Sequence, residues 1–412
     1  MFSTLQGWVN KWDIPSLEFR KLPMVFEHGQ EHYYVVWETS SAADEFSLEW
    51  WTDTTPSSEQ GGAHNIVKAQ YKVLSESHHR YSAIIGPIGL ASKVHYKCTS
   101  NKASTDEYTI ARRGEMELTR ILVISDNQNG DEEFRQVLTG IQNHYGSHVP
   151  DAILHTGDSV QYADRLEDWQ NQLFSPLEDG GGYQHSSPMV FVPGNHDHDK
   201  ARTPDNSNVY ADMYHGIMTT EGLGAPEVVN GSYHRFHHSV SLGSARIIAL
   251  DAECPSAEQS QFLERELQSE AFQSAQFRIV AMHIAPYIEF WDPYTWNEKG
   301  EKHWGEHIRL EYDPLFRRHN VDLVISGHQH NYQRGTAQRD PQSADSGSIT
   351  YAIVGGAGGG LDLVRVEDWN MYNVTYLDHH FVSLEIENRE LRWTAKNRAG
   401  DVVDQFNIVR EG

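Results

Sequence analysis

The stretch Ala152-Ile153-Leu154-His155-Thr156-Gly157-Asp158 decides the fold of this chain. Its apolar run has strand length and stops at Gly157, where glycine permits a tight turn that presents the Asp158 carboxylate at the end of a buried strand. Four other stretches follow the same plan, with an apolar run that stops at Asp, Asn or His. They are residues 121–128, 189–197, 278–283 and 321–330.

These strand ends predict one shared pocket. In open α/β sheets the functional crevice lies outside the carboxyl ends of the strands, so side chains that follow different strands can meet there. The side chains concerned are Asp126, Asp158, Asn195, His283, His328 and His330. They offer oxygen and imidazole ligands without a thiolate, a set that suits Mn, Fe or Zn. The pattern therefore predicts a metal centre.

Asp158, at the turn after residues 152–156, is the best candidate for a bridge between two ions, because one carboxylate has two oxygens. Two ions roughly 3.5–4 Å apart can hold phosphate oxygens and an attacking hydroxide, and so stabilise an in-line displacement. We expect hydrolysis of a phosphate ester by metal-bound hydroxide.

Composition limits the partners. The chain has 33 Lys and Arg against 58 Asp and Glu, a formal charge of −25, which repels nucleic acids and anionic membranes. We expect a small phosphorylated substrate, no nucleic-acid partner and no membrane partner, and the sequence leaves the oligomeric state open. Two cysteines imply no disulfide framework and favour a cytoplasmic protein, with secretion after removal of a signal as the alternative.

The pattern of elements predicts two domains. Residues 1–115 contain short strands between polar turns, typical of an antiparallel sandwich of the fibronectin or immunoglobulin-like type. The expected strands are residues 32–37, 46–51, 65–74, 80–85, 94–99 and 107–111. Residues 116–412 form the predicted catalytic domain, an α/β region in which a sheet lies between helices. Its expected helices are residues 131–145, 164–174, 257–269 and 312–319.

With these blocks the chain resembles the calcineurin-like metallophosphoesterases, and within them the purple-acid-phosphatase branch with its N-terminal β-sandwich. The blocks are Gly157-Asp158, Gly194-Asn195-His196-Asp197, Met282-His283 and Gly327-His328-Gln329-His330. Each block alone is weak evidence, whereas all of them in this order, each after an apolar strand, are strong evidence.

The resemblance implies roles for single residues. Asp126, Asp158 and His330 would bind the first ion. Asp158, Asn195, His283 and His328 would bind the second. His196 would lie beside the phosphate, as the proton donor to the leaving group or as a stabiliser of the transition state.

The chain departs from the purple branch in two places. That branch usually has Asp-x-Gly in the first block, where this chain has Asp126-Asn127-Gln128. That branch usually has a tyrosine three residues after the bridging aspartate, whereas here Gln161 stands there and Tyr162 follows. In the wider superfamily the first block is commonly Asp-x-His and in some members Asp-x-Gln, and Gln128 occupies that position. We favour Gln128 over Tyr162 as the remaining ligand, and two divalent ions over a ferric, purple centre, with a mixed-valence pair as the alternative.

Three further residues are candidates for substrate contacts. His303 and His307 lie in a long loop and could contact phosphate, although surface histidines are the simpler interpretation. Tyr332 could line the pocket or pack in the core. The glycine run of residues 355–360 lacks the Lys-Ser/Thr of a nucleotide-binding P-loop, so we expect a tight turn there.

Three functions fit the sequence. A phosphomonoesterase agrees with the purple-like layout. A phosphodiesterase or nucleotide pyrophosphatase is favoured by Gln128 and by Trp291, Trp296 and Trp304, which could stack on a base. A catalytically silent binding protein would use the sandwich for partners, but the intact set of candidate ligands argues against it.

Overall fold

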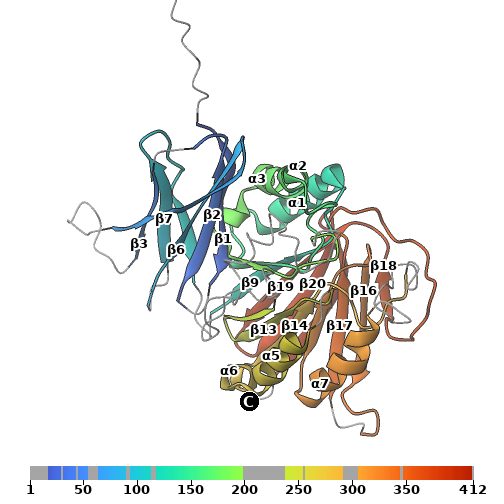
Figure 1. Cartoon of the computed structure of the whole chain (residues 1–412). Helices are drawn as coiled ribbons and strands as arrows, with labels where there is room; N and C mark the ends of the chain where they lie inside the picture. Colours follow the sequence, from blue (N-terminus) through green and yellow to red (C-terminus); the bar gives the residue numbers. More distant parts are fainter. Residues whose placement is uncertain are drawn as a thin grey trace, which may run out of the picture.

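The computed structural model describes residues 17–28, 31–42, 45–53, 64–89, 93–112, 117–197, 237–253, 256–290, 305–343 and 347–410. Strands dominate this part of the chain, and they form sheets of ten, seven and four strands. The four-stranded sheet lies at the end of the molecule that holds the N-terminal strands, while the helices flank the larger sheets (Figure 1).

The ten-stranded sheet runs through most of the molecule. In spatial order its strands are β21 (Val402–Val409), β20 (Glu390–Asn397), β19 (His380–Glu387), β9 (Thr119–Ile124), β10 (Ala152–His155), β11 (Met189–Phe191), β1 (Phe19–Glu27), β2 (Tyr33–Thr39), β6 (His78–Ile85) and β5 (Gln70–Ser75). Strands β9, β10 and β11 are parallel to one another. Three of the five predicted ligand strands are therefore neighbours.

The seven-stranded sheet holds the other two ligand strands. Its order is β12 (His238–Leu242), β13 (Ala245–Leu250), β14 (Phe277–Met282), β15 (Leu323–Ser326), β17 (Ser348–Val354), β16 (Tyr332–Gln338) and β18 (Val374–Tyr376). Strands β13, β14, β15 and β17 are parallel. The expected mixed α/β class is confirmed, but the ligand strands belong to two sheets and not to one.

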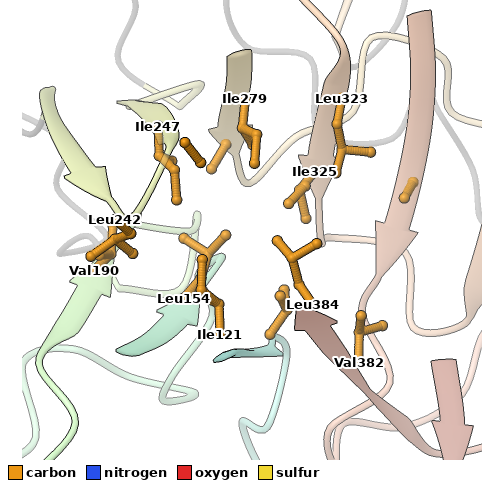
Figure 2. Close-up of a cluster of buried hydrophobic side chains, with 14 of the residues drawn as sticks. Ile121, Leu154, Val190, Leu242, Ile247, Ile279, Leu323, Ile325, Val382 and Leu384 are labelled. Atoms are coloured by element: carbon orange, nitrogen blue, oxygen red, sulfur yellow. The ribbon is translucent and has the colours of Figure 1, made fainter. Parts of the chain in front are cut away.

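The two large sheets pack face to face. Ile121, Leu154 and Leu384 of the ten-stranded sheet point toward Ile247 and Leu323 of the other (Figure 2). These side chains are fully buried. Two apolar sheet faces bury most area against each other, which is why the single layer predicted from the sequence was wrong.

Helices cover the outer faces of both sheets. The helix α1 (Asp131–Tyr145) packs its apolar side, including Phe134 and Val137, on the ten-stranded sheet. On the other side α5 (Ala257–Gln268) and α7 (Asp313–Arg318) pack on the seven-stranded sheet. The remaining helical pieces are α2 (Leu166–Asp168), the π-helix η2 (Trp169–Phe174), α3 (Ser175–Asp179), the 3-10 helix η3 (Tyr183–His185), α6 (Glu270–Ser274) and the π-helix η4 (Ile308–Tyr312).

The N-terminal region is all-β, as predicted. The four-stranded sheet consists of β4 (Asn65–Lys68), β3 (Phe46–Thr52), β7 (Lys93–Ser100) and β8 (Tyr108–Ala111). It packs on β1, β2 and β6 through a shared apolar core. The single strand predicted for residues 65–74 is instead β4 and β5, which belong to different sheets. The fibronectin or immunoglobulin-like type and the domain boundary after residue 115 stay predictions.

One strand joins the N-terminal region to the rest. The sequence did not predict β1, and this strand pairs in parallel with β11 through Phe26 and Met189. The N-terminal strands and the ligand strands β9, β10 and β11 thus belong to one continuous sheet. Among the residues described above, no helix is long and apolar enough to cross a bilayer.

Candidate metal centre

The predicted ligands meet where the carboxyl ends of strands from both large sheets come together. Asp126 and Asp158 follow β9 and β10, and Asn195 lies four residues beyond β11. From the other sheet, His283 follows β14, and the turn after β15 carries the two remaining histidines, His328 and His330. All except Asn195 and His330, which are half-buried, are almost fully buried.

The acidic and imidazole side chains form two overlapping groups. Ligand atoms of Asp158, His283 and His328 lie within 4.8 Å of one another, and so do those of Asp126, Asp158 and His330. Asp158 belongs to both groups. Its Oδ2 lies 3.2 Å from His283 Nε2, and Asp126 Oδ1 lies 3.4 Å from His330 Nε2.

Asn195 adds an oxygen ligand to the group of Asp158, His283 and His328. Its Oδ1 lies 3.1 Å from His283 Nε2 and 2.9 Å from His328 Nδ1. One amide oxygen thus faces two imidazole nitrogens, which is the arrangement that a shared cation would produce from neutral nitrogen and oxygen ligands.

Gln128 lies beside the group of Asp126, Asp158 and His330. Its amide Nε2 is 3.1 Å from Asp158 Oδ2 and 3.1 Å from His330 Nε2, and its Oε1 is buried without a hydrogen-bond partner among the described residues. The oxygen and nitrogen of an amide exchange places by rotation, and their assignment follows the surrounding hydrogen bonds. Half a turn of this amide would direct its oxygen at the gap between Asp158 and His330, so Gln128 fits the position of a neutral oxygen ligand.

Tyr162 occupies a different position. Its half-exposed ring is covered by the Arg165 guanidinium, whose Cζ lies 3.9 Å from the ring centre. Its backbone N–H donates to Asp168 Oδ2 at 3.1 Å. Gln128 thus contacts Asp158 and His330, and the choice of Gln128 over Tyr162 stays a prediction.

Backbone strain is concentrated in this group. Asp126, Asp158 and His328 have φ angles of 59°, 54° and 70°, in the left-handed region that non-glycine residues seldom adopt. Such conformations persist where the surroundings impose them, and they cluster at functional sites. Gly327, next to His328, is required for close approach, because a Cβ there would lie 2.3 Å from Asp126 Oδ2.

Backbone carbonyls orient two of the histidines. His283 Nδ1 lies 2.8 Å from the Thr156 carbonyl oxygen, and His330 Nδ1 lies 2.6 Å from that of Gly360. When Nδ1 carries the proton and donates it to a carbonyl, Nε2 keeps its lone pair for a ligand. In both histidines Nε2 is the nitrogen that faces the carboxylates.

Asp197 holds the turns that carry Asp158 and Asn195. Its carboxylate accepts hydrogen bonds from the backbone N–H groups of Asp158, Ser159 and Gly194, at 2.7, 2.9 and 2.8 Å. Burial and the neighbouring Asp158 carboxylate raise the pKa of Asp197 to about 7. Asp197 is buried, and it acts on the site through these backbone contacts.

The electrostatics of the group call for positive charge. Burial works to raise the pKa of the Asp126 and Asp158 carboxyls, but His283, together with His330 beside Asp126 and His196 beside Asp158, outweighs it and lowers both. Conversely, burial works to lower the pKa of His283, yet the two carboxylates raise it to about 10. The donor set and this demand for cations both fit metal ions.

The glycine run of residues 355–360 lies against the loop that carries Asp126. The N–H groups of Gly358 and Gly359 donate to the Asp126 carbonyl oxygen at 3.2 and 2.7 Å, and Ala357 N donates to Ser125 O at 2.9 Å. The run is a turn, as expected, and it packs against the loop that carries Asp126.

The remaining candidates divide. His196 is half-buried beside the group: its N–H donates to Asp158 Oδ1 at 2.8 Å, and its Nδ1 lies 3.1 Å from the Gln161 carbonyl oxygen. Tyr332 is fully buried, and its hydroxyl donates to Asp404 Oδ2 at 2.6 Å, so it belongs to the core and not to a substrate pocket. His307 packs edge-on against Tyr312, with ring centres 5.0 Å apart. His303 and the three loop tryptophans lie outside the described residues.

Fold and site together define the class of protein. Residues 119–332, just over half of the chain, match the calcineurin-like phosphoesterase family, and the chain belongs to it. This family places the chain among the metal-dependent phosphoesterases.

The relatives narrow the family to its purple-acid-phosphatase branch, as the sequence predicted. From Arabidopsis thaliana, "Probable inactive purple acid phosphatase 27" is 24% identical and covers 72% of this chain and 51% of its own length. "Fe(3+)-Zn(2+) purple acid phosphatase 12" is 28% identical over 50% of this chain and 40% of its own length. The chain spans about half the length, or less, of these curated relatives.

Solved structures agree in fold. The purple acid phosphatase PPD1 from yellow lupin superposes with a TM-score of 0.73 at 18% identity, covering 94% of this chain and 74% of the lupin chain. PhoD superposes with a TM-score of 0.62 at 12% identity, covering 94% and 88%. These neighbours confirm the metallophosphoesterase architecture.

Proposed function

We propose that this chain is a phosphatase that hydrolyses small phosphate esters at a centre of two metal ions. The observation that carries the proposal is the position of Asp158, which belongs to both ligand groups: its Oδ2 lies 3.2 Å from His283 Nε2 in one group and 3.1 Å from Gln128 Nε2 beside the other. The first ion would be held by Asp126, Gln128, Asp158 and His330. The second would be held by Asp158, Asn195, His283 and His328.

Bound ions at these positions would supply charge for the phosphate oxygens and activate water for attack in line with the leaving group. Mn, Fe or Zn suits the donors, and a pair of divalent ions is favoured because the proposed additional ligand, Gln128, offers a neutral amide and not a phenolate. The chain's own residues then set the orientation of the ester.

His196 is the proposed proton donor to the leaving group. Its backbone N–H is fixed on Asp158, and its Nδ1 donates to the Gln161 carbonyl oxygen. Both contacts leave Nε2 as the nitrogen available to a substrate. A general acid must lie within hydrogen-bond reach of the group that it protonates, and a half-buried position at the edge of the ligand groups satisfies that requirement.

Diester or pyrophosphate hydrolysis is the alternative for the same centre. The observation in its favour is Gln128, which occupies the ligand position with a neutral amide in place of a phenolate. A non-catalytic role has the name of the 24%-identical relative in its favour, and the complete set of ligand side chains against it.

The deciding experiment combines metal content with turnover. Metal-stripped protein is reconstituted with Mn, Fe or Zn and assayed on a chromogenic phosphate monoester and the corresponding diester. Two metal equivalents, with monoester turnover that is lost in Asp158→Asn, would support the phosphatase. A preference for the diester would favour the alternative. Two bound equivalents without turnover of either ester would contradict both activities.

A further inference from the structure

The side chain of Gln172 connects the two loops that carry the candidate ligands of the first ion. Gln172 lies in the π-helix η2 and is 8% exposed. Its Oε1 accepts hydrogen bonds from the backbone N–H groups of Asn129 and Gln161, at 2.9 and 2.8 Å. Asn129 belongs to the loop after β9, and Gln161 to the loop after β10.

A second connection runs through Asn127. The Asn127 amide donates to the carbonyl oxygens of Gln172 and Ser159, at 2.7 and 2.8 Å, and its Oδ1 lies 2.7 Å from His155 Nε2. The inner parts of the two loops are also joined directly, by Asp126 N to Gly157 O and Gln128 N to Asp158 O. Gln172 therefore holds the parts of the two loops that follow these backbone bonds, at Asn129 and Gln161.

The two N–H groups that Gln172 holds are next to functional side chains. Asn129 directly follows Gln128, the candidate ligand. The carbonyl of Gln161 holds His196 Nδ1, so the orientation of the proposed proton donor depends on how the Gln161 peptide is fixed. The Oε1 atom of Gln172 thus influences the position of Gln128, a candidate ligand of the first ion, and the orientation of the His196 imidazole.

Gln172 also helps to hold the backbone at Tyr162. Its amide donates to Asp168, and Asp168 accepts the N–H of Tyr162 at 3.1 Å. With the N–H groups of Gln161 and Tyr162 both held from the side of η2, the Tyr162 ring lies under Arg165. A π-helical turn is rare and is frequently found at functional sites, and here it supplies the residue that fixes this loop.

We propose that Gln172 is a positioning residue of the phosphoesterase site, which keeps Gln128 and His196 in the geometry that metal binding and leaving-group protonation require. The inference rests on the proposed function for its catalytic part. That Gln172 holds the loops after β9 and β10 can be measured without any turnover.

The test compares three variants of the full chain. Gln172→Ala removes the shared acceptor. Gln170→Ala is the matched control, because Gln170 lies in the same π-helix and its amide donates to Ser175 Oγ, away from both loops. Gln172→Glu combined with Asp168→Asn is the rescue variant, since it reverses donor and acceptor between the two side chains and keeps an oxygen for both N–H groups.

The first readouts are amide hydrogen exchange and metal content. In Gln172→Ala we expect the amides of Asn129 and Gln161 to exchange about tenfold faster, as loss of about one hydrogen bond predicts. We also expect loss of up to one of the two metal equivalents on dialysis. The control and the rescue variant should resemble the wild type. Unchanged exchange at these amides, or faster exchange with full metal content, would overturn the proposal.

The second readout separates Gln172 from the general stability of the fold. If His196 is misplaced, turnover should fall most for esters with poor leaving groups, so the rate should depend more steeply on the leaving-group pKa. An equal loss for all esters would contradict the positioning of His196. If the wild type with two metals hydrolyses nothing, the proposed function fails, while the exchange and metal data still decide whether Gln172 positions the ligands.

Discussion

His330 and Asp362 hold each other through two hydrogen bonds: His330 N donates to Asp362 Oδ2 at 2.9 Å, and Asp362 N donates to His330 O at 3.1 Å. Gly360, two residues earlier, accepts from His330 Nδ1. His330 is half-buried, and this segment after β17 fixes both its backbone and its ring. The candidate ligand is therefore oriented by a part of the chain far from its own strand.

We predict that Asp362→Ala lowers the affinity of the first metal position roughly 10- to 100-fold, the range typical of lost outer contacts to a ligand. Asp368→Ala is the control, because this exposed residue of the same segment accepts the N–H of Asn370 and lies 4.0 Å from the Arg365 guanidinium. Metal titration with a competing chelator measures both. Equal affinities in the two variants would show that Asp362 does not orient the ligand.

The second prediction concerns the additional ligand. Gln128→Ala should reduce the bound metal toward one equivalent, since it removes the amide beside Asp158 and His330, whereas Tyr162→Phe should retain two. Protein reconstituted with ferric iron should lack the visible charge-transfer band of a bound phenolate. A band that disappears in Tyr162→Phe would contradict the choice of Gln128.

Glycines beside the site give the third prediction. A Cβ at Gly327 would lie 2.2 Å from Ser125 Oγ and 2.3 Å from Asp126 Oδ2, whereas a Cβ at Gly360 has nothing within 4 Å. We expect Gly327→Ala to displace Asp126 and to lose metal and several degrees of thermal stability. Gly360→Ala should match the wild type in both. The comparison requires metal analysis and thermal unfolding; full metal content in Gly327→Ala would show that the Asp126 loop adapts.

Part of this site was predictable because its signals are local. Asp158 and His283 each stand directly after a buried apolar run, so strand, turn and ligand lie within one short segment. The order of the blocks then indicated the family. Within each sheet the parallel strands present their carboxyl ends on the same edge, so the ligands of one sheet could be expected to lie together.

The rest depends on pairings that no local pattern records. Phe26 pairs with Met189 across most of the N-terminal half, and this contact joins the sandwich to the ligand strands. Gln172 reads as an ordinary helix residue, but its partners Asn129 and Gln161 lie 43 and 11 residues away. Tyr332 follows the ligand turn in sequence, and only the buried Asp404 contact shows that it packs in the core.

The last prediction concerns stability against acid, and it depends on His380. This histidine is fully buried in β19, and burial is the main cause that lowers its pKa to about 4, with His379 adding to it. A hydrogen bond to the Asp378 carbonyl and the Asp378 and Asp126 carboxylates raise the pKa without cancelling that effect. The folded protein therefore keeps His380 neutral where an exposed histidine is charged.

The sign follows from proton uptake. Between pH 6.5 and 4 the unfolded chain binds a proton at residue 380 that the folded chain does not, so the free energy of unfolding decreases as the pH falls through this window. The contribution reaches about 3 kcal/mol at the acid end. We expect His380→Gln to remove this part of the pH dependence, which appears as a widening difference between the urea midpoints of variant and wild type.

The measurement uses metal-stripped protein from pH 7.5 to 4. Titrating groups that the variant and the wild type share cancel in the difference between their curves. His148→Gln is the control, because it makes the same replacement at an exposed histidine. If the His380→Gln curve is parallel to that of the wild type, His380 becomes protonated in the folded state, and burial does not hold its pKa below the ordinary value.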